Sequence, residues 1–218
     1  MEKIYYSTLD NETFGGAASP KGSYHLGGII HDGNGKIVCG FNYLIAENYE
    51  QINKDEYAKD NFERYEAMRA SGNATMIDTE EHAVEMVEQL FKFYNVKYVM
   101  AYNSAFDLIK TKCAKLIENR EFIDLWLMAL ETIIQYKSYA KFCHENNFQS
   151  RNKKSCSTTA EAVYAFLTNN PTYNEEHTAF EDSKIELSIF IACRRTHKKY
   201  TRNVHCMDAS PFALFPRW

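Results

Sequence analysis

The stretch KIYYSTLDNE, Lys3 to Glu12, decides the fold, because its first seven residues favour a β-strand and two acids follow it closely. Two further apolar runs come next, His25 to His31 (HLGGIIH) and Lys36 to Ile45 (KIVCGFNYLI). Between them lies Asp32-Gly33-Asn34-Gly35, whose residues tolerate positive φ angles and are typical of a hairpin turn. The sequence therefore predicts three strands in an antiparallel meander, the first of which runs into a turn at Asp10.

A polar, charged stretch from Glu47 to Asp78 follows the meander and indicates a peripheral helical insertion. Thr79 then precedes two glutamates, which suits the N-terminal cap of a helix with acids in its first turn. Apolar residues recur at helical spacing from Ala83 to Phe91, so this helix is expected to bury one face.

The second half of the chain alternates strands and helices. Val96 to Tyr102 (VKYVMAY) is a short apolar strand, the residues from Asn103 onward favour a helix, and Glu121 to Ile123 favour the next strand. Asp124 is placed to cap a helix through Ile133, and further helices are expected near Tyr139 to Glu145, Thr158 to Leu167 and His177 to Arg195. The expected fold class is α/β: a mixed sheet, three antiparallel strands and then parallel strands, flanked by helices.

Length and composition limit the class of protein. The 218 residues are 45% hydrophobic, which suits a single domain over residues 1–218 with a tail at about 203–218. A net charge of −4 argues against coating of long duplexes, although an enzyme that holds only the end of a strand can be acidic. The six scattered cysteines and the lack of a signal-like or membrane-spanning segment favour a reduced, cytoplasmic protein. Cys193, His197, His205 and Cys206 match no familiar zinc-ligand spacing.

Asp10 and Glu12 are the first candidates for chemistry. Taken alone, two carboxylates near the end of a strand are usually solvated turn residues. Alternation along a strand nevertheless places positions 10 and 12 on the same side, where both acids can face one site. Two like charges held that close are stabilised by a cation, and hard oxygen ligands favour Mg²⁺ or Mn²⁺.

Three more candidates occur later in the chain. Asp107 follows the crossover strand, where a carboxylate can simply favour the positive end of a helix. Asp182 lies in the first turns of the last long helix and can equally be a solvated side chain. His177 precedes Asp182 by five residues, and a lone histidine is more often a cap or a partly buried residue than a catalyst.

The order of these motifs carries a resemblance. They are Leu9-Asp10-Asn11-Glu12-Thr13, Tyr102-Asn103-Ser104-Ala105-Phe106-Asp107 and His177-Thr178-Ala179-Phe180-Glu181-Asp182. In this order the chain resembles the histidine subclass of the DEDD 3′→5′ exonucleases, a family with the ribonuclease H-like fold, from Lys3 to about Ile191. It is also similar to small exonuclease-type proteins carried by bacteriophages, which implies the cytoplasm of a host cell.

The resemblance implies a role for each residue. Asp10, Glu12, Asp107 and Asp182 would hold two divalent ions, Mg²⁺ or Mn²⁺, and His177 would be the general base that activates water. Two such ions can stabilise both the attacking and the leaving oxygen at phosphorus, and an imidazole titrates close enough to neutrality to accept the proton. Single-stranded DNA or RNA would lose 5′-mononucleotides from its 3′ end.

Contacts with the substrate are less sharply defined. The resemblance places Thr13, Phe14, Asn103 and Phe106 near the terminal nucleotide, whereas both phenylalanines can equally be core residues. A basic group (Arg194, Arg195, Lys198, Lys199 and Arg202) can contact the substrate backbone or simply complement the end of a helix. Two alternatives stay open: a noncatalytic nucleic-acid or polymerase-partner binding module on the same fold, and a nuclease for very short oligonucleotides.

Overall fold

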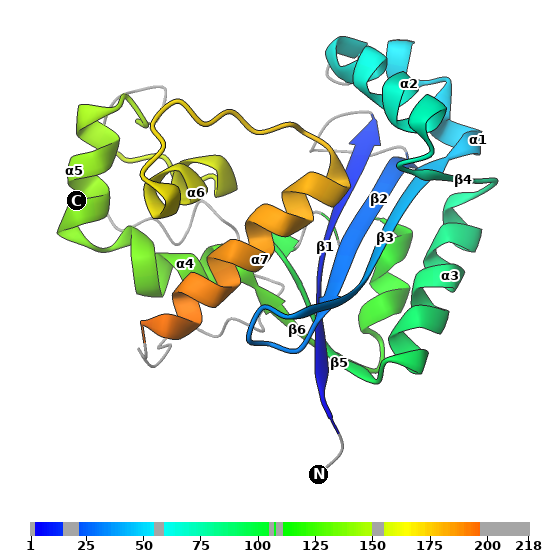
Figure 1. Ribbon diagram of the computed structural model, residues 1–218, viewed down its shortest axis with the longest axis horizontal. Helices are drawn as coiled ribbons and strands as arrows, with labels where there is room; N and C mark the ends of the chain where they lie inside the picture. The colour runs from blue at the N-terminus through cyan, green and yellow to red at the C-terminus, as the bar shows by residue number, and fades with distance from the viewer. Residues whose placement is uncertain are drawn as a thin grey trace.

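The computed structural model describes residues 3–14, 22–54, 59–104, 107, 111–149 and 155–196. One mixed sheet of six strands, in the order β4-β3-β2-β1-β5-β6, forms its centre (Figure 1). The strands are β1 (Tyr5–Phe14), β2 (Gly22–His31), β3 (Ile37–Ile45), β4 (Thr75–Ile77), β5 (Val96–Ala101) and β6 (Glu121–Asp124). The helices are α1 (Ala46–Tyr49), α2 (Phe62–Ser71), α3 (Glu80–Phe93), α4 (Leu125–Ala129), α5 (Lys137–Glu145), α6 (Ala160–Thr168) and α7 (Ala179–Arg195), with short 3₁₀ turns η1 (Ile52–Lys54), η2 (Lys59–Asn61) and η4 (Lys112–Ile117) and a π-helix η5 (Leu130–Ile134).

The strand pairing confirms the predicted α/β class. β1, β2 and β3 form the antiparallel meander, while β5 lies parallel to β1 and β6 parallel to β5. The turn between β2 and β3 contains Gly33 and Gly35 at φ +76° and +98°, and the Asp32 side chain accepts the backbone N–H of Asn34 at 2.9 Å. The expected hairpin chemistry is therefore present at the expected residues.

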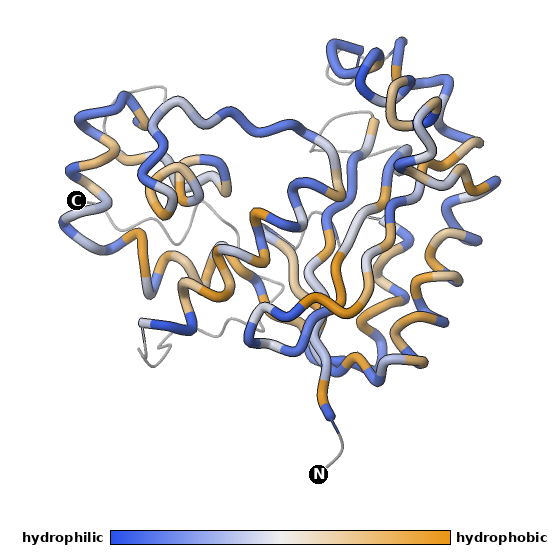
Figure 2. Tube along the Cα trace, viewed as in Figure 1, coloured by the Kyte–Doolittle hydropathy of each residue, from blue (hydrophilic) through white to orange (hydrophobic). Residues whose placement is uncertain are grey.

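The two faces of the sheet are covered by different helices. Leu9 on β1 packs into a cluster with Phe41, Val84 and Phe91, which belong to β3 and to α3. Tyr6, on the opposite face of β1, packs against Phe190 of α7 with ring centroids 5.6 Å apart. Figure 1 shows α7 crossing the sheet, and Figure 2 shows apolar residues along the middle of the strands and the helices beside them. Even-numbered residues of β1 consequently face α7 as far as Glu12, where the pairing register with β2 shifts.

Two helix caps predicted from the sequence are confirmed. The Thr79 hydroxyl accepts the backbone N–H of His82 at 3.1 Å and begins α3. The Asp124 carboxylate accepts the backbone N–H groups of Trp126 and Leu127 and begins α4, which continues into the π-helix. Its second oxygen accepts the hydroxyl of Ser104 at 2.9 Å, so the cap also ties the end of β6 to the turn after β5.

The predicted boundaries need two corrections. β1 runs on to Phe14, so Asp10 and Glu12 lie inside the strand and not in a turn after it, because β2 pairs with β1 along this whole length. The stretch 47–78 is not only a peripheral helical insertion. It contributes β4, parallel to β3 at the sheet edge, and its Tyr65 is fully buried with Tyr24, Leu44 and Ile52.

Several predictions fall beyond the described residues: the tail at 203–218, Phe106, most of the helix expected after Asn103, and three of the four residues weighed as zinc ligands. Between β5 and β6, the regular element formed by the described residues is η4. In the part of the chain that the structure covers, no helix is both long and apolar enough to cross a membrane.

Candidate active site

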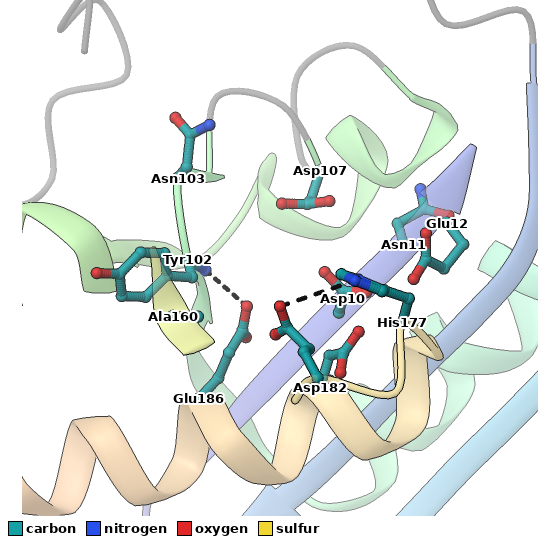
Figure 3. A pocket seen from close by; sticks show the side chains of 11 residues that line it. Asp10, Asn11, Glu12, Tyr102, Asn103, Asp107, Ala160, His177, Asp182 and Glu186 are labelled. Atoms are coloured by element: carbon teal, nitrogen blue, oxygen red, sulfur yellow. Dashed lines mark hydrogen bonds and ion pairs between the residues drawn. The ribbon is translucent and has the colours of Figure 1, made fainter. Parts of the chain in front are cut away.

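The predicted acids meet at one pocket between β1, the turn after β5 and the N-terminal half of α7 (Figure 3). Asp10 and Glu12 project from β1 toward α7, and Asp182 comes from the first turn of that helix. One ligand atom from each of these three lies within 4.8 Å of the others. The pocket, called the acidic pocket below, has a volume of ≈ 240 Å³ and is lined by Asp10, Asn11, Glu12, Tyr102, Asn103, Asp107, Ala160, Glu175, His177, Asp182 and Glu186.

Asp107 enters the acidic pocket from the opposite side, with 4% of its surface exposed. It stands outside the tight group formed by the other three acids. Its pKa is raised well above the usual range, first by burial and then by the charges of Asp10 and Glu12. The four predicted acids therefore share one electrostatic environment, although they come from three separate segments.

Two further acids, Glu175 and Glu186, line the acidic pocket and were not predicted from the sequence. Glu175 lies in the loop before α7, where nothing distinguishes it from its solvated neighbours. Figure 2 shows that this loop is largely hydrophilic. Glu186 follows Asp182 by four residues, a spacing that puts both on the same face of a helix. That spacing was the signal available for Glu186.

Crowding and burial raise the pKa of every acid in this group. Burial, followed by the charge of Glu175, raises the pKa of Glu12 to about 7. Burial, followed by the charge of Asp10, raises the pKa of Asp182 to about 10. Asp10 itself is raised well above its ordinary value by burial and then by Glu12. Without a cation the acidic pocket therefore retains protons that solvent-exposed carboxyls would release near neutral pH.

Two orphaned oxygen atoms show that the residues suit a cation. Oδ1 of Asp182 and Oε2 of Glu186 are inaccessible to solvent and have no hydrogen-bond partner among the described residues. Buried carboxylate oxygens without a partner are costly and call for an ion or a water molecule. The described lining includes no Lys or Arg to serve instead. An all-oxygen donor set fits hard divalent ions such as Mg²⁺ or Mn²⁺.

His177 stands at the rim of the acidic pocket. Its side chain is 60% exposed, and its Nδ1 lies 3.9 Å from Oε2 of Glu175. Its backbone has φ +51°, a left-handed conformation that is uncommon outside glycine and asparagine. The Tyr65 hydroxyl donates to the His177 carbonyl at 2.8 Å, so the buried tyrosine of α2 holds this unusual backbone in place.

The N-terminus of α7 is fixed by a buried histidine of β2. The backbone N–H of Ala179 donates to Nδ1 of His25 at 3.2 Å, and the other ring nitrogen lies 2.6 Å from Oδ1 of Asn42. Burial lowers the pKa of His25 to about 4, so the ring is neutral and Nδ1 can accept while Nε2–H donates to Asn42. α7 therefore starts at a defined point on the sheet.

The predicted substrate contacts separate into two groups. Asn103 lines the acidic pocket with its backbone at φ +63°. Thr13 and Phe14 lie further along β1, outside the lining, and Phe14 packs against the cluster that contains Tyr65. Of the basic group, Arg194 donates to the Gly33 carbonyl and lies over the Phe190 ring, contacts that tie α7 to the hairpin turn; Lys198, Lys199 and Arg202 fall outside the described residues.

Comparison with known proteins adds evidence on the fold. No protein-family model matches the chain, and no curated protein sequence does. Among solved structures, the crystal structure of cell-death related nuclease 4 is similar, with a TM-score of 0.50 and 14% sequence identity over 90% of this chain and 67% of that one. At this identity the similarity shows the fold: the chain has a ribonuclease H-like mixed sheet flanked by helices.

Proposed function

We propose that this protein is a 3′→5′ exonuclease that uses two divalent ions, Mg²⁺ or Mn²⁺, to release 5′-mononucleotides from single-stranded DNA or RNA. The observation that carries the proposal is the convergence of Asp10, Glu12 and Asp182 within 4.8 Å, with Asp107 in the same pocket and His177 at its rim. The ribonuclease H-like fold, shared with a nuclease, supports the same class of reaction.

The four predicted acids would hold the ions. When bound, two divalent ions act as Lewis acids that stabilise the attacking and leaving oxygens of an in-line displacement at phosphorus. The orphaned oxygen of Asp182 fits this role, since it is buried, has no hydrogen-bond partner among the described residues and belongs to a side chain that lines the pocket. The acids from β1 and α7 are held by the sheet and by a helix, which keeps them in place without substrate.

His177 would move the proton. Its exposed imidazole at the rim can reach a water molecule beside the phosphate, and Glu175 at 3.9 Å can stabilise the imidazolium that forms. As the new bond from the water oxygen to phosphorus forms, the bond from phosphorus to the 3′ oxygen of the preceding nucleotide breaks. The water proton goes to His177, and the leaving oxygen takes a proton from solvent. Asn103, which lines the pocket, would contact the terminal nucleotide. We propose the same contact for Thr13, Phe14 and Phe106.

A labelled-strand assay tests this proposal. With Mg²⁺ or Mn²⁺, a 5′-labelled single strand should give a ladder that shortens progressively, whereas a 3′-labelled strand should release labelled mononucleotide from the start. Asp10→Asn and His177→Ala should abolish both products, while His82→Ala, which alters a half-exposed histidine on α3, should leave them unchanged. Intact strands of DNA and RNA with either metal would contradict the proposal.

A substrate-length series defines the enzyme further. Rates on a dinucleotide and on a long oligonucleotide separate a nuclease for very short oligonucleotides from one that degrades long strands. The same series on DNA and RNA gives the sugar preference. A noncatalytic binding module, or a polymerase partner, would bind these strands and leave every one intact.

A further inference from the structure

Glu186 is the most deeply buried acid of the acidic pocket. The proposed function assigns it no role. It lies on α7 between the core residues Ile185 and Leu187, and only 2% of its surface is exposed. One helical turn separates it from Asp182, so both side chains leave the helix on the side that faces β1 (Figure 3). A glutamate is rarely buried this deeply unless its carboxylate has a partner.

The two oxygens of Glu186 have different surroundings. Oε1 accepts the backbone N–H of Tyr102 at 2.8 Å, which anchors the side chain to the end of β5. Tyr102 is itself held, because its hydroxyl donates to the Thr158 carbonyl at 2.7 Å. Oε2 is inaccessible to solvent and has no hydrogen-bond partner among the described residues. The carboxylate is therefore fixed by one oxygen and leaves the other unpaired among the described residues, in a side chain that lines the acidic pocket.

The position of Glu186 within the pocket distinguishes it from Glu12. In Figure 3 these two acids lie on opposite sides of Asp182. Glu12 belongs to the tight group with Asp10 and Asp182, and Glu186 does not. Glu186 thus lies on the side of Asp182 away from Glu12, and it lines the same pocket as Asp107.

We infer that Glu186 is a fifth carboxylate ligand of the metal centre, binding the second divalent ion together with Asp10 and Asp107. This inference rests on the two ions of the proposed function and adds a ligand that the four-acid motif does not contain. The Tyr102 amide sets the direction of the carboxylate, as hydrogen bonds to a ligand's far atom do in other metal sites. The ion in turn satisfies the orphaned oxygen.

Manganese binding to Glu186→Gln in the full chain tests the inference. Glutamine keeps the volume and the oxygen that accepts from Tyr102, but it loses the charge. By calorimetry or by the paramagnetic resonance of free Mn²⁺, wild-type protein should bind two ions. The variant should bind one of them on the order of 10- to 100-fold more weakly, a loss that even outer ligands of a metal site cause when removed.

A matched control is available on the same helix. Glu181→Gln removes the same charge from α7, but Glu181 lies outside the acidic pocket and pairs with Lys184 at 2.5 Å, so both ions should bind normally. Glu186→Asp keeps the charge but withdraws it by one methylene, and it should weaken the same ion as Glu186→Gln. Two normal binding sites in both Glu186 variants would overturn the inference.

Failure of this inference is separable from failure of the proposed function. Normal Mn²⁺ binding by the Glu186 variants, together with strand cleavage by wild type, rejects Glu186 as a ligand and keeps the exonuclease. Weakened binding of one ion, together with wild-type protein that leaves every strand intact, supports the fifth ligand and rejects the exonuclease.

Discussion

Gly27 lies against the backbone of the first turn of α7, and replacing it with alanine should open the candidate site. Gly27 on β2 pairs with Asp10 on β1. A Cβ at Gly27 would lie 2.2 Å from the backbone nitrogen of Phe180 and 2.4 Å from the carbonyl carbon of Ala179. Both are backbone atoms of the first turn of α7, so the clash cannot be relieved by rotating a side chain.

The displacement follows from these distances. Ordinary contact begins at 3.4 Å, so the start of α7 must retreat by about 1.2 Å from a Cβ that would sit at 2.2 Å. Metal–ligand distances tolerate only about 0.2 Å, and a misplacement of about 1 Å can cost on the order of 100-fold in rate. The hydrogen bond from Ala179 to His25, at 3.2 Å, would also lengthen beyond its useful range. We expect Gly27→Ala to lose most metal affinity and cleavage, and about 1–3 kcal/mol of stability from overpacking.

The neighbouring glycine is the control. A Cβ at Gly28 would lie 2.1 Å from Cζ of Phe41, on the face of the sheet that is turned away from α7. Gly28→Ala should therefore lose comparable stability but keep normal metal affinity in the folded protein. Mn²⁺ titrations and 5′-label cleavage, made at a temperature where melting curves show both variants folded, compare the two. Normal Mn²⁺ affinity in Gly27→Ala would refute the reasoning that this contact sets the position of α7.

Three further predictions concern other parts of the structure. Tyr65→Phe removes the hydroxyl that holds the His177 carbonyl, and should lower kcat by roughly 5- to 10-fold, the equivalent of one neutral hydrogen bond, with Mn²⁺ affinity unchanged; an unchanged kcat would contradict this. Metal-free protein should melt at a higher temperature at pH 5 than at pH 8, because folding raises the pKa of Glu12 to about 7 and of Asp182 to about 10. The protonated acids' contribution to stability is fully present below the pKa values of the unfolded chain. It is lost as pH rises through the pKa values of the folded protein. Saturating Mg²⁺ should restore the melting temperature at pH 8, and a flat profile in both conditions would argue against a shared acidic site. Arg120→Ala breaks a buried ion pair at 2.6 Å with α3 and should cost roughly 3 kcal/mol in denaturant unfolding, without changing Mn²⁺ affinity.

Local patterns in the sequence predicted the meander, the crossover and two caps, because each depends on residues close together in the chain. The Asp32 to Gly35 turn needs only its own positive φ angles, and Thr79 needs only the amide three residues on. β4 was missed for a different reason. Thr75 to Ile77 is three residues long and largely exposed, and its strand geometry comes from pairing with β3 and not from its own alternation.

The candidate site was predictable in part. Asp10, Glu12 and Asp182 could be named from order and spacing, but their convergence depends on where α7 crosses β1. The four-residue spacing from Asp182 also pointed to Glu186, but it did not single this residue out. A glutamate between two apolar residues is equally typical of the border between the buried and the exposed face of a helix. Only the contact of its carboxylate with the Tyr102 amide, 84 residues away, distinguishes the two cases.

The geometry of the site depends on one joint, the contact between α7 and the meander. α7 supplies Asp182 and Glu186 one turn apart, so a single rotation or shift of this helix moves both acids relative to Asp10. The joint is fixed from β2, where Gly27 allows close approach and His25 accepts the first helical amide. Along the rest of the helix, Ile189 and Phe190 are buried in the core shared with α4 and hold its far end. In the absence of metal, mutual repulsion among the acids pushes against this joint as they lose their protons, and the packing of α7 opposes that repulsion. The fold can therefore keep several acids close together for cation binding, because the residues that fix the position of α7 lie outside the pocket itself.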